Sequence, residues 1–203
     1  MGKHVACICI ISAIIMLVNV LTGGALPAHA EADGPCDPLP VTGNLIEVTP
    51  AQAGQLRTLI AGASTGDTFL LHDGTYNLNG DYVWIDTPGI TIRSYSGNRE
   101  AVIIDANYTG SEIITIAASD VTLADLTLMR AYTHPIHVVS TSSGDTNNTL
   151  IYNVHIIDPR EQAIKINPSM SGYYMDNGTV ACSHIELTDT CLLYTSDAAD
   201  EED

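Results

Sequence analysis

Basic residues are scarce in this sequence. Lysine and arginine together number 7, against 24 aspartate and glutamate residues, so the formal net charge at pH 7 is −17. An acidic surface of this kind repels nucleic-acid phosphates and anionic membranes. We therefore expect neither as a partner. We expect an acidic polysaccharide to bind only where cations bridge the two surfaces.

Long apolar runs are also scarce, and the clearest one lies near the N-terminus, between Val5 and Val20. The small-x-small pattern Ala28-His29-Ala30 follows it. This succession predicts a secretory signal peptide over residues 1–30. The alternative is an uncleaved membrane anchor, but the run is short and poorly flanked for a spanning helix. We expect a secreted or periplasmic protein with no membrane span after signal cleavage.

The C-terminal residues 191–203 break the pattern that precedes them. One back-translation of Cys191–Glu201 resembles a transposase-type sequencing-library adapter, which a natural acidic tail would not explain. We therefore expect residues 191–203 to be a non-native tail, and the native chain to continue beyond about Thr190 with further repeats.

Cysteine is scarce as well. Cys7 and Cys9 fall in the predicted signal peptide and Cys191 in the predicted tail, which leaves Cys36 and Cys182. Secretion would permit a disulfide between them. However, the repeat described below assigns Cys182 to an inward strand position, so we expect a buried thiol.

A Pro-rich segment, residues 31–48, leads into the folded part of the chain. Thr49 then stands as a helix N-cap, with Pro50 at the first helical position and Gln52 where a capping box places it. The pattern predicts a helix ending at Gly62. Beyond it the periodicity becomes two, which predicts a strand and an Asp-Gly turn within residues 66–76.

Apolar residues then recur at offsets 0, 2, 5 and 7, in copies that start at Ile90, Val121, Thr149 and Val180. Each copy predicts two short strands that meet at a two-residue bend. A third strand recurs as the pairs Val83/Ile85, Ile114/Ile116, Ile136/Val138 and Ile164/Ile166. Repeats of this kind predict a solenoid, in which stacked units share one core.

The bends distinguish the solenoid from a β-sandwich, the alternative with coincidental spacing. Ala124-Asp125 and Tyr152-Asn153 contain none of the glycines that hairpin turns prefer. Because Asp125 and Asn153 occupy matching bend positions, we expect them to form a hydrogen-bonded ladder and not a metal site.

The predicted helix, the motif Gly66-Asp67-x-x-x-Leu71-x-x-Gly74-x-Tyr76 and the repeats together resemble the pectate-lyase superfamily. The likeness covers about Thr49 to Thr190. It implies an all-β, right-handed parallel β-helix with three short strands per coil and an N-terminal capping helix, of which residues 49–190 are the N-terminal part. The superfamily includes polysaccharide lyases of the chondroitinase B and alginate lyase type, and also hydrolases, epimerases and tail-spike adhesins. The last repeats are similar to uncharacterised bacterial β-helix repeat proteins.

The resemblance implies a cleft on the face formed by the third strands and by the loops that precede them. Alternation predicts an outward column at about 4.8 Å per coil along this face. The column and its loops contain the residues Trp84, Thr115, Arg130, Tyr132, His134, His137, Asp158, Arg160, Glu161 and Lys165.

These side chains could perform lyase chemistry on a uronic acid. We expect His137 and Lys165 to be the catalytic pair, because a neutral imidazole or amine can take the proton beside the carboxyl group. Either Ca²⁺ or a second basic residue can neutralise the substrate carboxylate, and the expected Ca²⁺ ligands are Asp158 and Glu161. The residues expected to bind substrate are Trp84, Arg130, Tyr132 and Arg160.

Two classes of function remain open. The first is a secreted carbohydrate-active protein, a polysaccharide lyase acting on uronic-acid-containing glycans. The second is a non-catalytic glycan-binding or adhesive surface module. In both cases the expected partner is a polysaccharide or cell-surface glycan, and the full-length protein is expected to be monomeric. We expect His155 and His184 to be surface or bend residues and not metal ligands.

Overall fold

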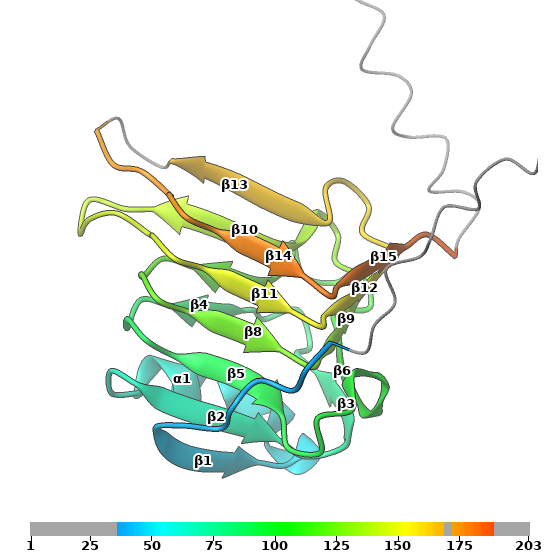
Figure 1. Ribbon diagram of the computed structural model, residues 1–203. Helices are drawn as coiled ribbons and strands as arrows, with labels where there is room; N and C mark the ends of the chain where they lie inside the picture. The colour runs from blue at the N-terminus through cyan, green and yellow to red at the C-terminus, as the bar shows by residue number, and fades with distance from the viewer. Residues whose placement is uncertain (1–35, 169–171, 189–203) are drawn as a thin grey trace, which may run out of the picture. The chain divides into compact units, whose positions relative to one another are not determined.

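Three sheets of parallel strands and one short α-helix make up the fold in the computed structural model, which describes residues 36–168 and 172–188 (Figure 1). The predicted signal peptide and the predicted tail at 191–203 lie outside the described residues. Sheet A consists of β1 (Asn44–Val48), β2 (Asp67–Leu71), β5 (Thr91–Ser94), β8 (Thr122–Ala124), β11 (Leu150–Tyr152) and β14 (Thr179–Ala181). Sheet B consists of β3 (Gly74–Asn77), β6 (Val102–Asp105), β9 (Thr127–Met129), β12 (His155–Ile157) and β15 (His184–Glu186). Sheet C consists of β4 (Val83–Ile85), β7 (Glu112–Ile116), β10 (His134–Ser140) and β13 (Ile164–Pro168).

From β2 onward, consecutive strands belong to different sheets, and the chain returns to a given sheet with every third strand. The pairs between these strands are parallel, as in β5 with β8 and β8 with β11. A β-sandwich of hairpins would pair sequential strands antiparallel. The arrangement is therefore compatible with a parallel β-helix. We call the chain between successive strands of sheet A a repeat.

The N-terminal end of the stack is covered by helical residues. A 3₁₀ segment, η1 (Pro50–Gln55), leads directly into α1 (Leu56–Ala61), at the position where the capping box predicted a helix. The Gln52 Oε1 accepts a hydrogen bond of 3.0 Å from the Thr49 backbone N–H. Leu56 and Ile60 are buried in the core, so the helical segment closes this end of the stack.

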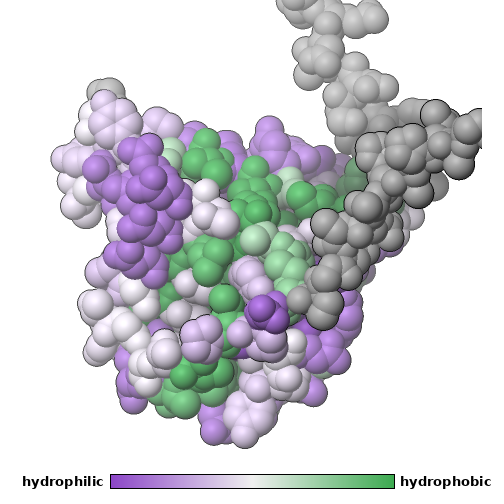
Figure 2. Space-filling model, viewed as in Figure 1, coloured by the Kyte–Doolittle hydropathy of each residue, from purple (hydrophilic) through white to green (hydrophobic). Residues whose placement is uncertain are grey.

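The core is built from aliphatic columns that run through successive repeats. In sheet B, Ile104, Leu128 and Ile156 are neighbours in register and fully buried. The next member of the same column, Ile185, is 53% exposed because no described strand lies beyond β15. Figure 2 shows apolar side chains gathered toward this end of the stack, where Val180 of β14 is also half exposed. Each inward aliphatic is thus buried by its neighbouring repeats.

The register of the last repeat differs from the sequence prediction. Ile151 pairs with Val180, so the fourth copy of the pattern starts at Gly178 and not at Val180. With this register Cys182 falls at the bend and not at an inward position. Its φ of 57° matches the φ of 56° at Asp125 and of 51° at Asn153, the equivalent bend residues. The expected buried thiol is wrong, because Cys182 forms a disulfide with Cys36 across a Cα–Cα distance of 6.0 Å.

The segment before β1, residues 36–42, forms an N-terminal strap that crosses several repeats of sheet A (Figure 1). At one end the Thr68 Oγ1 donates to the Thr42 carbonyl at 2.7 Å. Further along, the Arg93 guanidinium donates to the Leu39 carbonyl at 2.8 Å and the Tyr152 hydroxyl donates to the Asp37 carbonyl at 2.6 Å. The Pro-rich segment predicted over residues 31–48 thus provides both this strap and strand β1.

Within residues 36–168 and 172–188, no helix has the length and apolar character needed to cross a membrane.

Candidate functional site

The outer face of sheet C presents the column that the sequence predicted. Strand pairing places Trp84 beside Thr115, Thr115 beside His137, and His137 beside Lys165. The residues that flank this column in β7 and β10, among them Ile114 and Ile116, point into the core and are fully buried. Alternation along short parallel strands therefore brings side chains from four repeats onto one face.

His137 is held between two polar side chains. Its Nδ1 lies 2.7 Å from the Glu112 Oε1, and its Nε2 lies 2.8 Å from the Asn167 Oδ1. The other Glu112 oxygen accepts a hydrogen bond from the Thr115 hydroxyl. A carboxylate at Nδ1 favours the tautomer that carries its proton there and leaves Nε2 as the basic atom. As placed, the Asn167 oxygen can only accept, so Nε2 carries a proton and both ring nitrogens of His137 donate. Nε2 becomes the base once the Asn167 amide turns, because its NH₂ group now donates to the Pro168 carbonyl at 3.3 Å.

Glu112 and Asn167 are functional candidates that the sequence reasoning missed. Glu112 begins β7, and the strand register places it beside His134. The sequence did contain a signal for Glu112, because it lies at the start of the strand that contains Thr115. The loop residues just before the strands of His137 and Lys165 were considered for this reason, and Glu112 occupies a similar position one repeat earlier. Asn167 follows Lys165 by two residues along β13 and therefore extends the polar surface along the strand.

His134 lies at the edge of this group and is 4% exposed. Its ring meets that of His137 edge to face, with centroids 5.8 Å apart. The Nδ1 has no hydrogen-bond partner among the described residues, and the Glu161 Oε2 lies 3.8 Å from it. Burial, and then the nearby charge of Lys165, lower the pKa of His134 below its usual value. His134 is therefore a neutral imidazole at pH 7.

Lys165 provides positive charge beside His137. Its ammonium group forms no ion pair or hydrogen bond within the part of the chain that the structure describes. Because the side chain is only partly buried and lies next to His137 in register, its charge is available to a ligand. A carboxylate is the natural partner of such a group.

The predicted substrate-binding residues differ in whether their side chains are free to contact a ligand. The Arg160 guanidinium lies over the Tyr132 ring, 4.6 Å from its centroid, and Tyr132 is exposed. This stacked pair lies at the edge of the outer face of sheet C, where a ligand can reach it. Arg130, in contrast, donates two hydrogen bonds to the buried Asp105 carboxylate, which raise its pKa further above the usual value. Arg130 is thus occupied within the protein.

The residues predicted to bind Ca²⁺ do not converge. Both carboxylate oxygens of Asp158 accept hydrogen bonds of 2.6 Å from Thr188, whereas Glu161 extends toward His134. Ca²⁺ requires six to eight oxygen ligands around one point. Among the described residues, no group of three metal-ligating side chains includes Asp158 or Glu161. These two side chains do not fit a calcium site as placed.

Comparison with known proteins gives no match: no protein-family model, no curated protein and no solved structure matches this chain. The chemistry that this face can perform therefore follows from its own geometry.

Proposed function

We propose that this chain is part of a secreted, right-handed parallel β-helix protein with three strands per coil, and that it acts as a lyase on polysaccharides containing uronic acids. The observation that supports the proposal is the group on the outer face of sheet C, in which Glu112 holds His137 beside Lys165. A carboxylate, an imidazole and an ammonium group provide a positioned base and a countercharge on one surface.

Each of these groups has a defined part in the reaction. The His137 Nε2 removes the proton from the sugar carbon beside the carboxylate. The electrons of that C–H bond form a carbon–carbon double bond as the glycosidic C–O bond at the next carbon breaks. The proton on His137 passes to the departing oxygen, so no further reactant is consumed. Lys165 offsets the negative charge that builds up on the carboxylate, and Glu112 orients the imidazole.

The neighbouring side chains suit a sugar chain laid along the column. Trp84 lies at the N-terminal end of the column, and Tyr132 lies at its loop edge with Arg160 stacked on it. Aromatic rings offer flat apolar surfaces, and the guanidinium offers donors for hydroxyl and carboxylate oxygens. Local positive charge at Lys165 and Arg160 compensates for the acidity of the whole chain. The proposed partner is therefore a polysaccharide or cell-surface glycan.

The experiment is incubation of the full-length protein with alginate and with pectate, followed by absorbance of unsaturated ends in the near ultraviolet. We expect the product from the unchanged protein and a large loss of turnover in Lys165→Ala and His137→Ala. The matched control is His72→Ala, because His72 pairs with Glu47 at the end of β2, away from sheet C. If Lys165→Ala leaves the activity unchanged, the assignment of this site is wrong.

A second candidate function is a non-catalytic glycan-binding or adhesive module. It is favoured by the observation that both ring nitrogens of His137 already have hydrogen-bond partners. If the protein binds uronate polymers but releases no unsaturated product, it is a binding module and not a lyase. If Lys165→Ala then loses this binding, the outer face of sheet C is the binding surface.

A further inference from the structure

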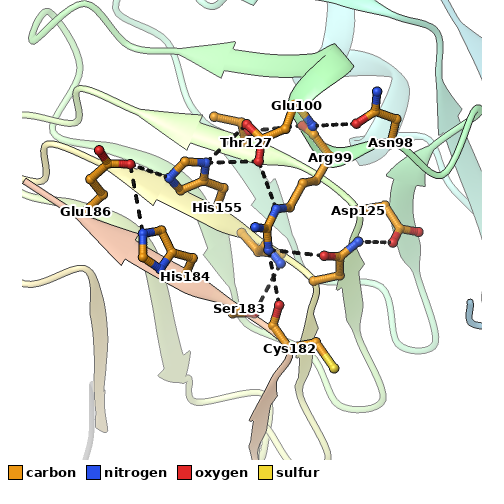
Figure 3. Close-up of polar contacts among 12 residues, drawn as sticks. Asn98, Arg99, Glu100, Asp125, Thr127, His155, Cys182, Ser183, His184 and Glu186 are labelled. Atoms are coloured by element: carbon orange, nitrogen blue, oxygen red, sulfur yellow. Dashed lines mark hydrogen bonds and ion pairs between the residues drawn. The ribbon is translucent and has the colours of Figure 1, made fainter. Parts of the chain in front are cut away.

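Three potential metal ligands converge on the outer face of sheet B, next to the bend that contains Cys182 (Figure 3). His155 of β12 and His184 of β15 are direct partners in register, and Glu186 follows His184 by two residues on the same face of β15. One ligand atom from each lies within 4.8 Å of the other two. The sequence expectation that these histidines are merely surface or bend residues does not hold for His155, which is buried in strand β12.

The distances suit a small divalent ion bound at one point. The His155 Nε2 lies 3.0 Å from the Glu186 Oε2, and the His184 Nε2 lies 3.9 Å from the same oxygen. Around a tetrahedral Zn²⁺, with bonds of about 2.0–2.2 Å, ligand atoms are about 3.3 Å apart. The His184 and Glu186 side chains are 58% and 42% exposed, so small rotations of both can close the remaining gap.

A second observation, independent of the three ligands, concerns the far side of the His155 ring. Its Nδ1 lies 3.2 Å from both oxygens of Glu100, and the Arg99 Nε donates to that carboxylate at 2.9 Å. Figure 3 shows both imidazoles turned toward the Glu186 carboxylate, with Glu100 behind His155. A carboxylate that accepts from Nδ1 fixes the tautomer whose Nε2 lone pair points at the metal, as found for histidine ligands of zinc.

The supporting carboxylate is itself held in place. The Arg99 Nη1 donates at 3.2 Å to the Asn153 Oδ1 and to the Cys182 carbonyl, and the Thr127 hydroxyl donates to the Arg99 carbonyl at 2.9 Å. Four successive repeats thus contribute to the support of one imidazole. Exposed ion pairs contribute little to stability, so folding alone does not require these contacts around Glu100. They are expected if the His155 imidazole must be held in one orientation.

We propose that His155, His184 and Glu186 bind a divalent first-row transition metal ion, with Zn²⁺ as the best fit, and leave a fourth position open to solvent. Two imidazoles and one carboxylate select such an ion over Ca²⁺ and Mg²⁺, which prefer oxygen ligands. The ion joins β12 to β15 and so stabilises the pairing of adjacent repeats. The site lies on a different sheet from His137, and the inference does not depend on the proposed lyase function.

The test uses the full chain after removal of bound metal with a chelator. Titration with ZnCl₂ followed by calorimetry is expected to give one ion per chain, and Co²⁺ is expected to give the visible absorption of a tetrahedral site. We expect His184→Gln to abolish both signals, whereas His72→Gln, a histidine paired with Glu47 elsewhere, leaves them unchanged. Both replaced side chains are at least one-third exposed, so neither substitution endangers folding.

Glu100→Gln tests the supporting contact separately. Loss of such a carboxylate lowers metal affinity by about 10- to 100-fold while the site is retained. His137→Ala is expected to leave Zn²⁺ binding unchanged, which separates this site from the proposed catalytic face. The inference is overturned if the unchanged protein binds no Zn²⁺, if His184→Gln binds it equally well, or if Ca²⁺ binds with the same affinity.

Discussion

Two columns of polar side chains run through successive repeats of this fold, and they differ in what lies over them. The first lies at the bend between sheets A and B, where Asp125 accepts a hydrogen bond of 2.7 Å from Arg93 and another of 2.8 Å from Asn153. The second is the face of sheet C with His137 and Lys165. The bend column is covered by the N-terminal strap, and the Arg93 and Asp125 side chains are each only 5% exposed.

The difference shows that periodic polar residues acquire their role from what covers them. The predicted ladder between Asp125 and Asn153 is confirmed, and the strap seals it by accepting hydrogen bonds from Arg93. No comparable segment pairs with Lys165 within the described residues. The polar groups of the bend column therefore bond to one another and stabilise the fold, whereas the column on sheet C retains groups that can bind a ligand.

Asp125→Ala should have the largest effect on stability. It would leave the buried Arg93 charge without its carboxylate, and breaking such a pair costs about 3–5 kcal/mol. Lys165→Ala, on the open column, should change the free energy of unfolding by only about 0.5 kcal/mol. Urea denaturation of the full-length variants measures both. Similar losses for the two substitutions would remove the distinction between the columns.

Removal of the disulfide should have the next largest effect. Cys36→Ser together with Cys182→Ser is expected to lower the free energy of unfolding by about 2–4 kcal/mol, because the unfolded chain loses a constraint between residues 146 positions apart. The urea midpoint should fall accordingly, and a reducing agent should lower the midpoint of the unchanged protein but not that of the double variant. A midpoint insensitive to reduction in both would show that the strap is held by its hydrogen bonds alone.

The pH dependence from His134 should be the smallest effect. Its pKa is lowered by burial and by Lys165, with Glu112, Glu161 and His137 also facing it. The unfolded chain therefore binds the proton more readily than the folded one, so stability is complete above about pH 6.5 and decreases as the pH falls toward the folded pKa. His134→Gln should flatten the curve of unfolding free energy against pH in this window. An unchanged slope would place the titrating group elsewhere.

The sequence predicted most of the fold because aliphatic residues mark the inward positions in the copies that start at 90, 121 and 149. The last copy was misplaced by two residues because Gly178 and Ser183 stand at two of its apolar positions. That shift put Cys182 inside the core and aligned His155 with Glu186. In the true register His155 lies beside His184, and the bend position of Cys182 faces the strap.

The rest of the site depends on contacts that no repeat encodes. The Glu112–His137 and Arg130–Asp105 hydrogen bonds each join residues 25 positions apart, a spacing set by irregular loops. The path of the strap is likewise unpredictable from local pattern, because its backbone carbonyls, which any sequence provides, make its contacts with Tyr152 and Arg93. Spacing identified the column of His137 and Lys165, but not the partners that orient His137.

The strap also changes the statistical mechanics of unfolding. A linear array of repeats interacts only with nearest neighbours, so its two ends open independently of each other. Here the segment that precedes β1 is bonded covalently to the bend between β14 and β15. The described repeats therefore form a closed cycle of contacts in place of an open line. Opening at one end strains the other, and unfolding of this part of the chain approaches a single all-or-none step.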